Sequence, residues 1–395
     1  MLIINGNLHT MAGCVYENGY IVLENGKIQQ IGPKEETPDS YVGKIVDAAG
    51  LTILPGLVDA HTHMGLFEDS LGFEGEDGNE DTDPTTPQMR VIDAINPMER
   101  SFAEAVDAGV TTVVVSPGSA NPAGGQIAAI KTYGRRIDDM VIRQPLAMKF
   151  ALGENPKYVY HEKGQTPTTR MATAAILREL LKKAREYAQN LERSVEEEDF
   201  DEPEYDAKLE ALLPLLRKEI PAHFHAHRAD DIFTAIRIAK EFDLDYVILH
   251  GTEGHLVADI LAEEGTKLII GPSMTDRSKP ELTNLDTRAA AILHQVGVPF
   301  SICTDHPETP EKYLMDCAGL AVRNGVAEEV ALEAITIRSA EIAGIADRVG
   351  SLEVGKDGDL VCYTGNPLDY RTRVQAVIIE GKIARGELKP CGKSM

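Results

Sequence analysis

The sequence predicts an α/β protein in which a large parallel sheet is joined to a small β-sandwich. Three observations predict this fold. The chain has 395 residues, enough for a full barrel and an accessory unit. Strand-like and helix-like segments alternate from residue 53 to about 345, as in successive βαβ units. Short strand-like runs separated by turns occupy both ends of the chain.

The two ends are expected to form one β-sandwich together, because neither has enough apolar residues to stand alone. Asn25-Gly26 between two strand-like runs is a strong hairpin signal, and Glu380-Gly381-Lys382 has the pattern of another hairpin turn. We therefore expect a sandwich domain of residues 1–52 plus 346–395 and a barrel domain of residues 53–345.

Composition excludes several classes of partner and location. The net charge of −24, from 39 basic and 63 acidic residues, argues against nucleic acid and anionic membranes as partners. No apolar run approaches the ~18 residues of a membrane helix, and no signal peptide is evident, so we expect a soluble, cytoplasmic protein. The five scattered cysteines indicate neither a disulfide framework nor a zinc ribbon, although Cys303 lies close to Asp305.

The stretch Ile53–His63 begins apolar and ends in two histidines one residue apart. In a strand, residues i and i+2 point to the same face, so His61 and His63 are expected to present two imidazoles side by side. Neutral imidazole is a good ligand for first-row metals. The pair therefore has the form of half a metal site; taken alone, it is equally compatible with two surface histidines at a strand end.

Later strand ends carry further candidate ligands. Lys149 lies within an apolar strand, His250 ends another before Gly251, and Asp305 ends the last one. One more strand carries three histidines on one face, His223, His225 and His227, of which only one need bind metal. His255 is an alternative to His250, beyond the strand. In strand order, the four later strand ends carry Lys149, His225, His250 and Asp305, and barrel active sites are found at the carboxyl ends of strands.

Three connections stand out from the regular alternation. The loop Leu66–Pro87 is acidic, has no basic residue and leaves the first strand, so it is either a lid or a solvated loop. Ser116–Gln126 is a Gly/Pro-rich loop whose backbone can approach a ligand. Residues 168–218 form an insertion with helical patterns at Thr169–Leu191 and Asp206–Lys218, which predicts a helical hairpin outside the barrel.

The motif from Pro55 to His63, Pro-Gly-Leu-Val-Asp-Ala-His-Thr-His, resembles the first-strand motif of the amidohydrolase superfamily. Within it, the chain most resembles the imidazolonepropionase-related amidohydrolases. The resemblance covers most of the chain, from Leu2–Gly6 to Gly365-Asn366-Pro367. It implies a metal-dependent hydrolase on a (β/α)8 TIM-like barrel, flanked by a sandwich of both termini.

The resemblance also implies a ligand set. In binuclear relatives a carboxylated lysine bridges two metals, which here gives one ion held by His61, His63, Lys149 and Asp305, and another held by Lys149, His225 and His250. Mononuclear relatives, imidazolonepropionase included, lack the bridge, and Lys149 would then bind a substrate carboxylate or an internal acid. The expected cofactor is a divalent metal, one or two ions, zinc before iron or manganese.

The expected reaction is attack of a metal-activated hydroxide on an amide carbon, with Asp305 as general base and His250 helping to hold the oxyanion. The expected substrate is a small cyclic amide, N-acyl amino acid or dipeptide. A deaminase using the same metal site is the alternative, and a non-catalytic binding protein is a third class. We also expect a homo-oligomer, a dimer or larger. Residues expected around the substrate are His227, Arg228, Arg277, Lys279, Tyr158 and His161.

Overall fold

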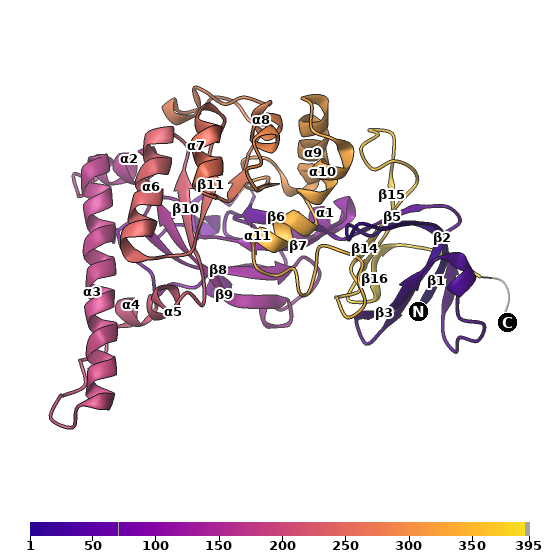
Figure 1. Ribbon diagram of the computed structural model, residues 1–395, viewed down its shortest axis with the longest axis horizontal. Coiled ribbons are helices and arrows are strands. Elements are labelled where there is room, and N and C mark those ends of the chain that lie inside the picture. Colours follow the sequence, from indigo (N-terminus) through magenta and orange to yellow (C-terminus); the bar gives the residue numbers. More distant parts are fainter. Residues whose placement is uncertain (70, 392–395) are drawn as a thin grey trace.

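The computed structural model describes residues 1–69 and 71–391 and places a terminal sheet beside a barrel along the long axis of the molecule (Figure 1). In the described residues the terminal sheet has nine strands, in the order β16-β15-β14-β5-β1-β2-β3, with β4 on β1 and β17 on β4. These strands are β1 (Leu2–His9), β2 (Val15–Glu24), β3 (Lys27–Gly32), β4 (Ile45–Asp47), β5 (Thr52–Pro55), β14 (Leu360–Tyr363), β15 (Val374–Ile379), β16 (Lys382–Gly386) and β17 (Lys389–Pro390).

The terminal sheet encloses its own apolar core, which contains side chains from both ends of the chain, among them Ile21, Ile53 and Ile378. Both predicted hairpins are confirmed. Asn25 and Gly26 turn between β2 and β3 with φ of 51° and 79°, and Glu380 and Gly381 turn between β15 and β16 with φ of 48° and 71°. Pairing of β5 with β14 joins the two ends of the chain, as the sandwich prediction requires.

The second sheet is the barrel, whose eight strands follow chain order from β6 to β13 in the described residues. Contacts between β13 and β6 bring its two edges together, so the barrel is nearly closed. Its strands are β6 (Leu57–Thr62), β7 (Val110–Val115), β8 (Ala123–Lys131), β9 (Val141–Ala151), β10 (Ala222–Ala226), β11 (Tyr246–His250), β12 (Leu268–Ile270) and β13 (Phe300–Ile302).

One barrel strand departs from the expected parallel order. β8 pairs antiparallel with both β7 and β9, whereas the other neighbouring strands are parallel. Residues 116–122 between β7 and β8 are too few for a helical crossover, so the chain turns straight back. The predicted loop Ser116–Gln126 is therefore wrong from Ala123 onward, where β8 begins.

Helices lie outside the barrel, most of them above the sheet and at its left end in Figure 1. They are α1 (Arg100–Ala108), α2 (Glu154–Glu162), α3 (Arg170–Glu196), α4 (Ala207–Glu210), α5 (Leu213–Leu216), α6 (Ala229–Phe242), α7 (Ala258–Glu263), α8 (Ala289–Gln295), α9 (Leu314–Arg323), α10 (Glu328–Glu333) and α11 (Ile337–Ile342). No helix in the described part of the chain is both long and apolar enough to cross a membrane.

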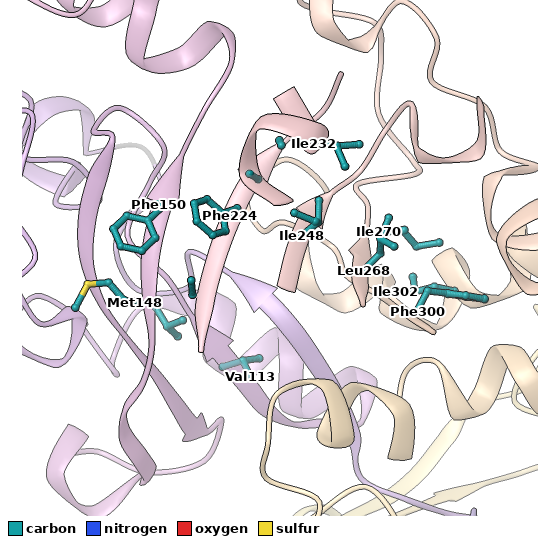
Figure 2. Packing of buried hydrophobic residues seen from close by; sticks show 14 of the residues in the cluster. Val113, Met148, Phe150, Phe224, Ile232, Ile248, Leu268, Ile270, Phe300 and Ile302 are labelled. Atoms are coloured by element: carbon teal, nitrogen blue, oxygen red, sulfur yellow. The ribbon is translucent and has the colours of Figure 1, made fainter. Parts of the chain in front are cut away.

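Side chains along each barrel strand alternate between the apolar core under the helices and the interior of the barrel. Figure 2 shows Phe150 of β9, Phe224 of β10 and Ile248 of β11 in one apolar layer that also contains Ile232 of α6. These side chains therefore face the helices. Because successive side chains of a strand point to opposite faces, their neighbours on the same strands point into the barrel.

The insertion is built differently from the predicted hairpin. α3 is a single long helix that buries Leu177, Leu181 and Ala184 against the barrel core, and its far end extends beyond the barrel (Figure 1). In place of one helix over Asp206–Lys218 there are two short ones, α4 and α5. Pro214 lies at the start of α5, where its missing N–H is tolerated, and it would have interrupted a continuous helix.

Gly56 connects the two sheets, because β5 before it belongs to the terminal sheet and β6 after it belongs to the barrel. Its N–H donates to the carbonyl of Asp359 at 2.9 Å. A Cβ at this position would lie 2.0 Å from Oγ1 of Thr111, which is a steric overlap. The glycine of the first-strand motif is thus required by packing.

We expect Gly56→Ala to destabilise the protein by on the order of 3 kcal/mol, because a rigid β-branched side chain of β7 would have to move. Gly319→Ala is the matched control, since Gly319 lies within α9 with open space around its Cβ position. That change should be neutral or stabilising by up to about 1 kcal/mol. Urea unfolding of both variants measures the difference; equal stabilities would contradict the steric account.

Candidate metal centre

Two groups of three potential metal ligands lie at the carboxyl ends of the barrel strands. His61, His63 and Asp305 form the first group, and within each group the ligand atoms lie within 4.8 Å of one another. The second group consists of His225, His227 and His250. The structure therefore brings together five of the six residues predicted as ligands, and adds His227, which was predicted to contact substrate.

The first group is organised around one oxygen of Asp305. Its Oδ1 lies 3.2 Å from Nε2 of His61 and 3.3 Å from Nε2 of His63. Nδ1 of His63 is 2.7 Å from the carbonyl of Ser116, which can only accept, so Nδ1 carries the proton. In the neutral ring, Nε2 of His63 is then an acceptor facing another acceptor. A cation between them satisfies both.

Asp59, a buried residue of β6, holds this group together. Its carboxylate accepts from the backbone N–H of His61 at 3.0 Å and from that of Thr304 at 2.8 Å. It thereby ties the histidine strand to the segment that carries Asp305, three residues beyond the end of β13. Asp59 stood in the sequence motif without a role; the structure shows that it positions ligands.

The second group is oriented by hydrogen bonds at Nδ1. Nδ1 of His250 donates to the carbonyl of Gly271 at 2.8 Å. The Nδ1 atoms of His225 and His227 lie 2.9 Å and 2.7 Å from the hydroxyls of Ser119 and Thr252. Such contacts fix ring orientation and leave Nε2 for an ion, as around metal-ligating histidines generally.

Electrostatics keep these rings in the form that metals bind. Burial lowers the pKa of His61, His225 and His227 well below the ordinary histidine value, and it lowers the pKa of His250 to about 4. All four rings are therefore neutral at pH 7. Buried polar atoms without partners are costly, and Nε2 of His61 and of His225 have no hydrogen-bond partner in residues 1–69 and 71–391.

Lys149 is fully buried in β9, and its Nζ has no hydrogen-bond partner in the part of the chain described. Burial lowers its pKa to about 7, against the opposing attraction of Asp305. Its charge acts on both groups, because it lowers the pKa of His61 and of His225. A partly unprotonated amine in this position is the form that reacts with carbon dioxide.

A cavity of about 350 Å³ opens onto both groups. That size suits a small molecule. Of the described residues that line it, Lys279 is the one lysine or arginine. The lining consists of His63, Phe67, Asn79, Gly118, Ser119, Asn155, His225, His227, His250, Pro272, Ser278, Lys279, Leu282, Asp305, Pro307 and Glu308.

The acidic loop forms one wall of this cavity. Asn79 accepts from the backbone N–H of Ala120 at 3.0 Å, and Gly118 donates to the carbonyl of Gly78 at 2.7 Å. Asp81 and Asp83 form ion pairs with Lys163 and Lys208 at 2.6 and 2.5 Å. The loop is therefore fastened beside the site rather than freely solvated.

The predicted substrate residues are spread over a wider area. Arg228 and Tyr158, with His161, line a neighbouring cavity of about 450 Å³, whereas Arg277 is absent from the described lining of either cavity. His227 and Lys279 reach the main cavity. The roles of these residues remain predictions, but their positions favour Lys279 over the two arginines.

Other candidates lie away from the cavity. His223 is buried deeper in β10, with both ring nitrogens unpartnered within the described residues. His255 lies on a short 3-10 helix and contacts the carbonyl of Thr252 at 3.0 Å, outside both ligand groups. Cys303 is fully buried, and burial raises the pKa of its thiol well above the usual value, so it is unreactive filler.

Glu281 is the residue that sequence reasoning missed. It lies between β12 and α8, in the short 3-10 helix Pro280–Leu282. Its side chain is buried, and Oε1 is 3.7 Å and 3.6 Å from Nε2 of His225 and His227. No strand end or spacing pointed to it, because it belongs to an irregular connection whose path only the folded chain fixes.

The donor sets of both groups fit a divalent metal. Neutral imidazoles with a carboxylate are the ligands of catalytic zinc, and of iron and manganese sites. Oδ1 of Asp305 and Nε2 of His61 and of His225 are buried atoms without a hydrogen-bond partner among the described residues. A cation is the group that resolves this arrangement.

Comparison with known proteins establishes the family. The model of the amidohydrolase family matches residues 52–384, and the chain belongs to that family. It is similar to imidazolonepropionase of Thermoplasma acidophilum, 25% identical over 95% of this chain and 90% of the relative. The resemblance drawn from the first-strand motif is thus confirmed, as is the barrel with a sheet of both termini. The family places the chain among hydrolases of C–N bonds that generally use a divalent metal.

Two further similarities support this assignment. An amidohydrolase structure from Thermotoga maritima superimposes with a TM-score of 0.93 at 41% identity, covering 98% of this chain and all of that one. Amidohydrolase tasK of Hapsidospora irregularis is 27% identical over 92% of this chain. The present chain spans only 39% of that relative's length.

We expect divalent metal to stabilise the protein strongly, because it would satisfy the buried acceptors of both groups. A metal present at a thousandfold its dissociation constant adds about 4 kcal/mol. Thermal melts of chelator-treated protein, with and without added Zn²⁺, Mn²⁺ or Fe²⁺, measure the gain. His61→Asn should reduce the gain, whereas His294→Asn, an exposed site on α8, should not. Identical melts with and without metal would contradict a metal centre.

Proposed function

We propose that the protein hydrolyses an amide C–N bond in a small molecule that carries a carboxylate. The observation that supports this most is the pairing of two ligand groups with a cavity of about 350 Å³ lined by Lys279. A divalent metal bound there would polarise the carbonyl and lower the pKa of water from ~16 to about 7. Zinc is the first choice, with iron or manganese also compatible with these donors.

Asp305 is proposed as the general base. Its Oδ1 faces His61 and His63, whereas Oδ2 lies 3.8 Å from Nδ1 of His250, so the carboxylate stands between the two groups. It would take a proton from the attacking water as the new C–O bond forms. The same proton would then pass to the leaving nitrogen as the C–N bond breaks, giving a carboxylic acid and an amine.

The other side chains would bind and orient the substrate. His250 donates its Nδ1 proton to Gly271, so its Nε2 is free to hold a metal ion, and through that ion His250 would help to stabilise charge that develops on the carbonyl oxygen. Lys279 would hold the substrate carboxylate as a point charge, with Asn79 and Asn155 as further polar contacts. Phe67 stacks edge-on against His63 and closes one side to water.

Lys149 is proposed to be carboxylated, which would convert a buried amine into a carboxylate shared by the two groups. Its burial, its unpartnered Nζ and its pKa of about 7 support this. An unmodified Lys149 that binds an acid stays the alternative. The mass of the intact protein, measured under non-acidic conditions, distinguishes the two.

A cyclic amide, an N-acyl amino acid and a dipeptide are the substrate classes proposed. The name of the imidazolonepropionase relatives denotes a cyclic amide with a propionate side chain. A propionate agrees with Lys279, the one lysine or arginine among the described residues that line the cavity. Deamination of a small heterocycle remains the alternative, and release of ammonia during turnover identifies it.

We expect Asp305→Asn to lower kcat by about 10²–10⁴-fold, because the amide cannot accept the proton. Turnover of a library of cyclic amides, N-acyl amino acids and dipeptides measures the loss, with metal content determined on the same samples. Asp138→Asn, at an exposed position, is the control and should be unaffected. Retained activity of the Asp305 variant on every substrate would rule out this role.

We expect Lys279→Met to raise KM at least tenfold for substrates with a carboxylate, and to change KM little for their neutral amide analogues. The reason is the loss of one charge-assisted contact, worth about 1.5–3 kcal/mol. Arg277→Met is the matched control, two residues away and outside the cavity lining described above. If both variants behave alike, Lys279 does not bind the substrate carboxylate.

A further inference from the structure

Glu281 is a buried carboxylate that the proposed reaction does not use. Its side chain is 1% exposed, and the charged partner of its Oε1 in the residues described is Nζ of Lys279, at 3.0 Å. This oxygen lies 3.7 Å from Nε2 of His225 and 3.6 Å from Nε2 of His227. Three acceptor-bearing side chains thus converge from β10 and from the connection after β12.

These separations suit ligands that share one ion. Two ligands about 2.1 Å from a tetrahedral zinc lie about 3.4 Å from each other. In the first group, the corresponding separations between Asp305 and its two histidines are 3.2 and 3.3 Å. Glu281 therefore lies almost as close to two histidines of the second group as Asp305 lies to the two histidines of the first group.

The rest of the fold holds Glu281 in this orientation. Its Oε2 accepts from the backbone N–H of Glu154 at 3.1 Å, and its own N–H donates to the carboxylate of Glu154 at 3.1 Å. A Cβ on Gly153, which has a φ of +84°, would lie 2.9 Å from the same Oε2. One oxygen is thus fixed by the start of α2, and the other is left facing the histidines.

Lys279 would compete with a metal ion for Glu281, since its Nζ lies 3.0 Å from Oε1 of that residue. That ammonium also contacts Asn155 at 3.3 Å and is 28% exposed on the cavity side. A half-buried lysine that lines the cavity can turn toward it, whereas the buried carboxylate is held by a backbone N–H. The carboxylate can therefore exchange the ammonium for an ion without moving.

We propose that Glu281 is the fourth protein ligand of a second divalent cation, held together with His225, His227 and His250. A carboxylated Lys149 would add one ligand to each group. Apart from Lys149, the second site has four protein ligands and the first has three, so the first keeps the more open position for water. The second ion would therefore order the cavity wall beside the first, reactive one. This inference rests on the proposed function in requiring metal at the same centre.

Metal binding by the full-length chain tests the proposal. Chelator-treated protein is reloaded with Co²⁺ or Zn²⁺, and bound metal per chain and dissociation constants are measured by elemental analysis and chelator competition. We expect the parent protein to bind two ions. Glu281→Gln should retain one ion and weaken the second at least tenfold. Glu154→Gln, which keeps an acceptor on the other side of the same pair of hydrogen bonds, should retain both.

A variant that gains a spectroscopic signal distinguishes the loss of a metal ligand from a folding defect. In Glu281→Cys loaded with Co²⁺, a thiolate ligand would add a sulfur-to-cobalt charge-transfer band in the near ultraviolet that the parent protein lacks. A folded Glu281→Cys without this band overturns the proposal. So does unchanged binding in Glu281→Gln, equal loss in Glu154→Gln, or a parent protein that binds a single ion.

The test of Glu281 as a metal ligand can fail independently of the test of amide hydrolysis. A protein that binds one ion and hydrolyses amides would overturn the role of Glu281 and leave the proposed function intact. A protein that binds two ions through Glu281 and hydrolyses no amide would do the reverse.

Discussion

The alternation of side chains along the barrel strands is the constraint on which the rest of the structure depends. Phe150 and Phe224 face the helices, so Lys149, His223 and His225 must face the barrel interior. A shift of one residue in register would send apolar side chains into the cavity and polar ones into the core. Packing of the outer layer therefore decides which side chains face the interior, and hydrogen bonds then orient the ligand rings.

Placing polar groups in the barrel interior costs free energy, and binding of a metal ion would recover it. The interior carries neutral imidazoles, a lysine and two carboxylates in contact with them, several of them without hydrogen-bond partners in the described residues. Such groups destabilise a fold unless something binds them. Residues around the ligands are satisfied, by contrast: Asp59, Ser119 and Thr252 each make the hydrogen bond that orients a neighbour. Among the described residues, Nε2 of His61, Nε2 of His225 and Oδ1 of Asp305 are thus buried atoms without partners that a metal would satisfy.

The terminal sheet stabilises the barrel from one side. β5 runs through Gly56 into β6, and Lys131 of β8 lies between Asp357 and Asp359, at 2.8 and 2.5 Å, just before β14. Burial alone would raise the pKa of Asp357. The three nearby cations outweigh this effect and lower the pKa to about 2; they are Lys131, Arg348 and Lys27. Both strands that this region anchors, β6 and β8, lead to the metal centre. The accessory sheet therefore contributes to the site through strand placement rather than by contact.

The sequence by itself determined the fold class, the two hairpins and the strand ends at His61, His63, His225 and His250, because period and turn chemistry are local properties. Resemblance to a known motif then selected the family. Local patterns could not reveal the reversal of β8 or the place of Glu281, since each depends on which distant segments meet. His227 and Glu281 were decided by tertiary structure alone: their atoms converge only once β10 and the connection after β12 close over the same space.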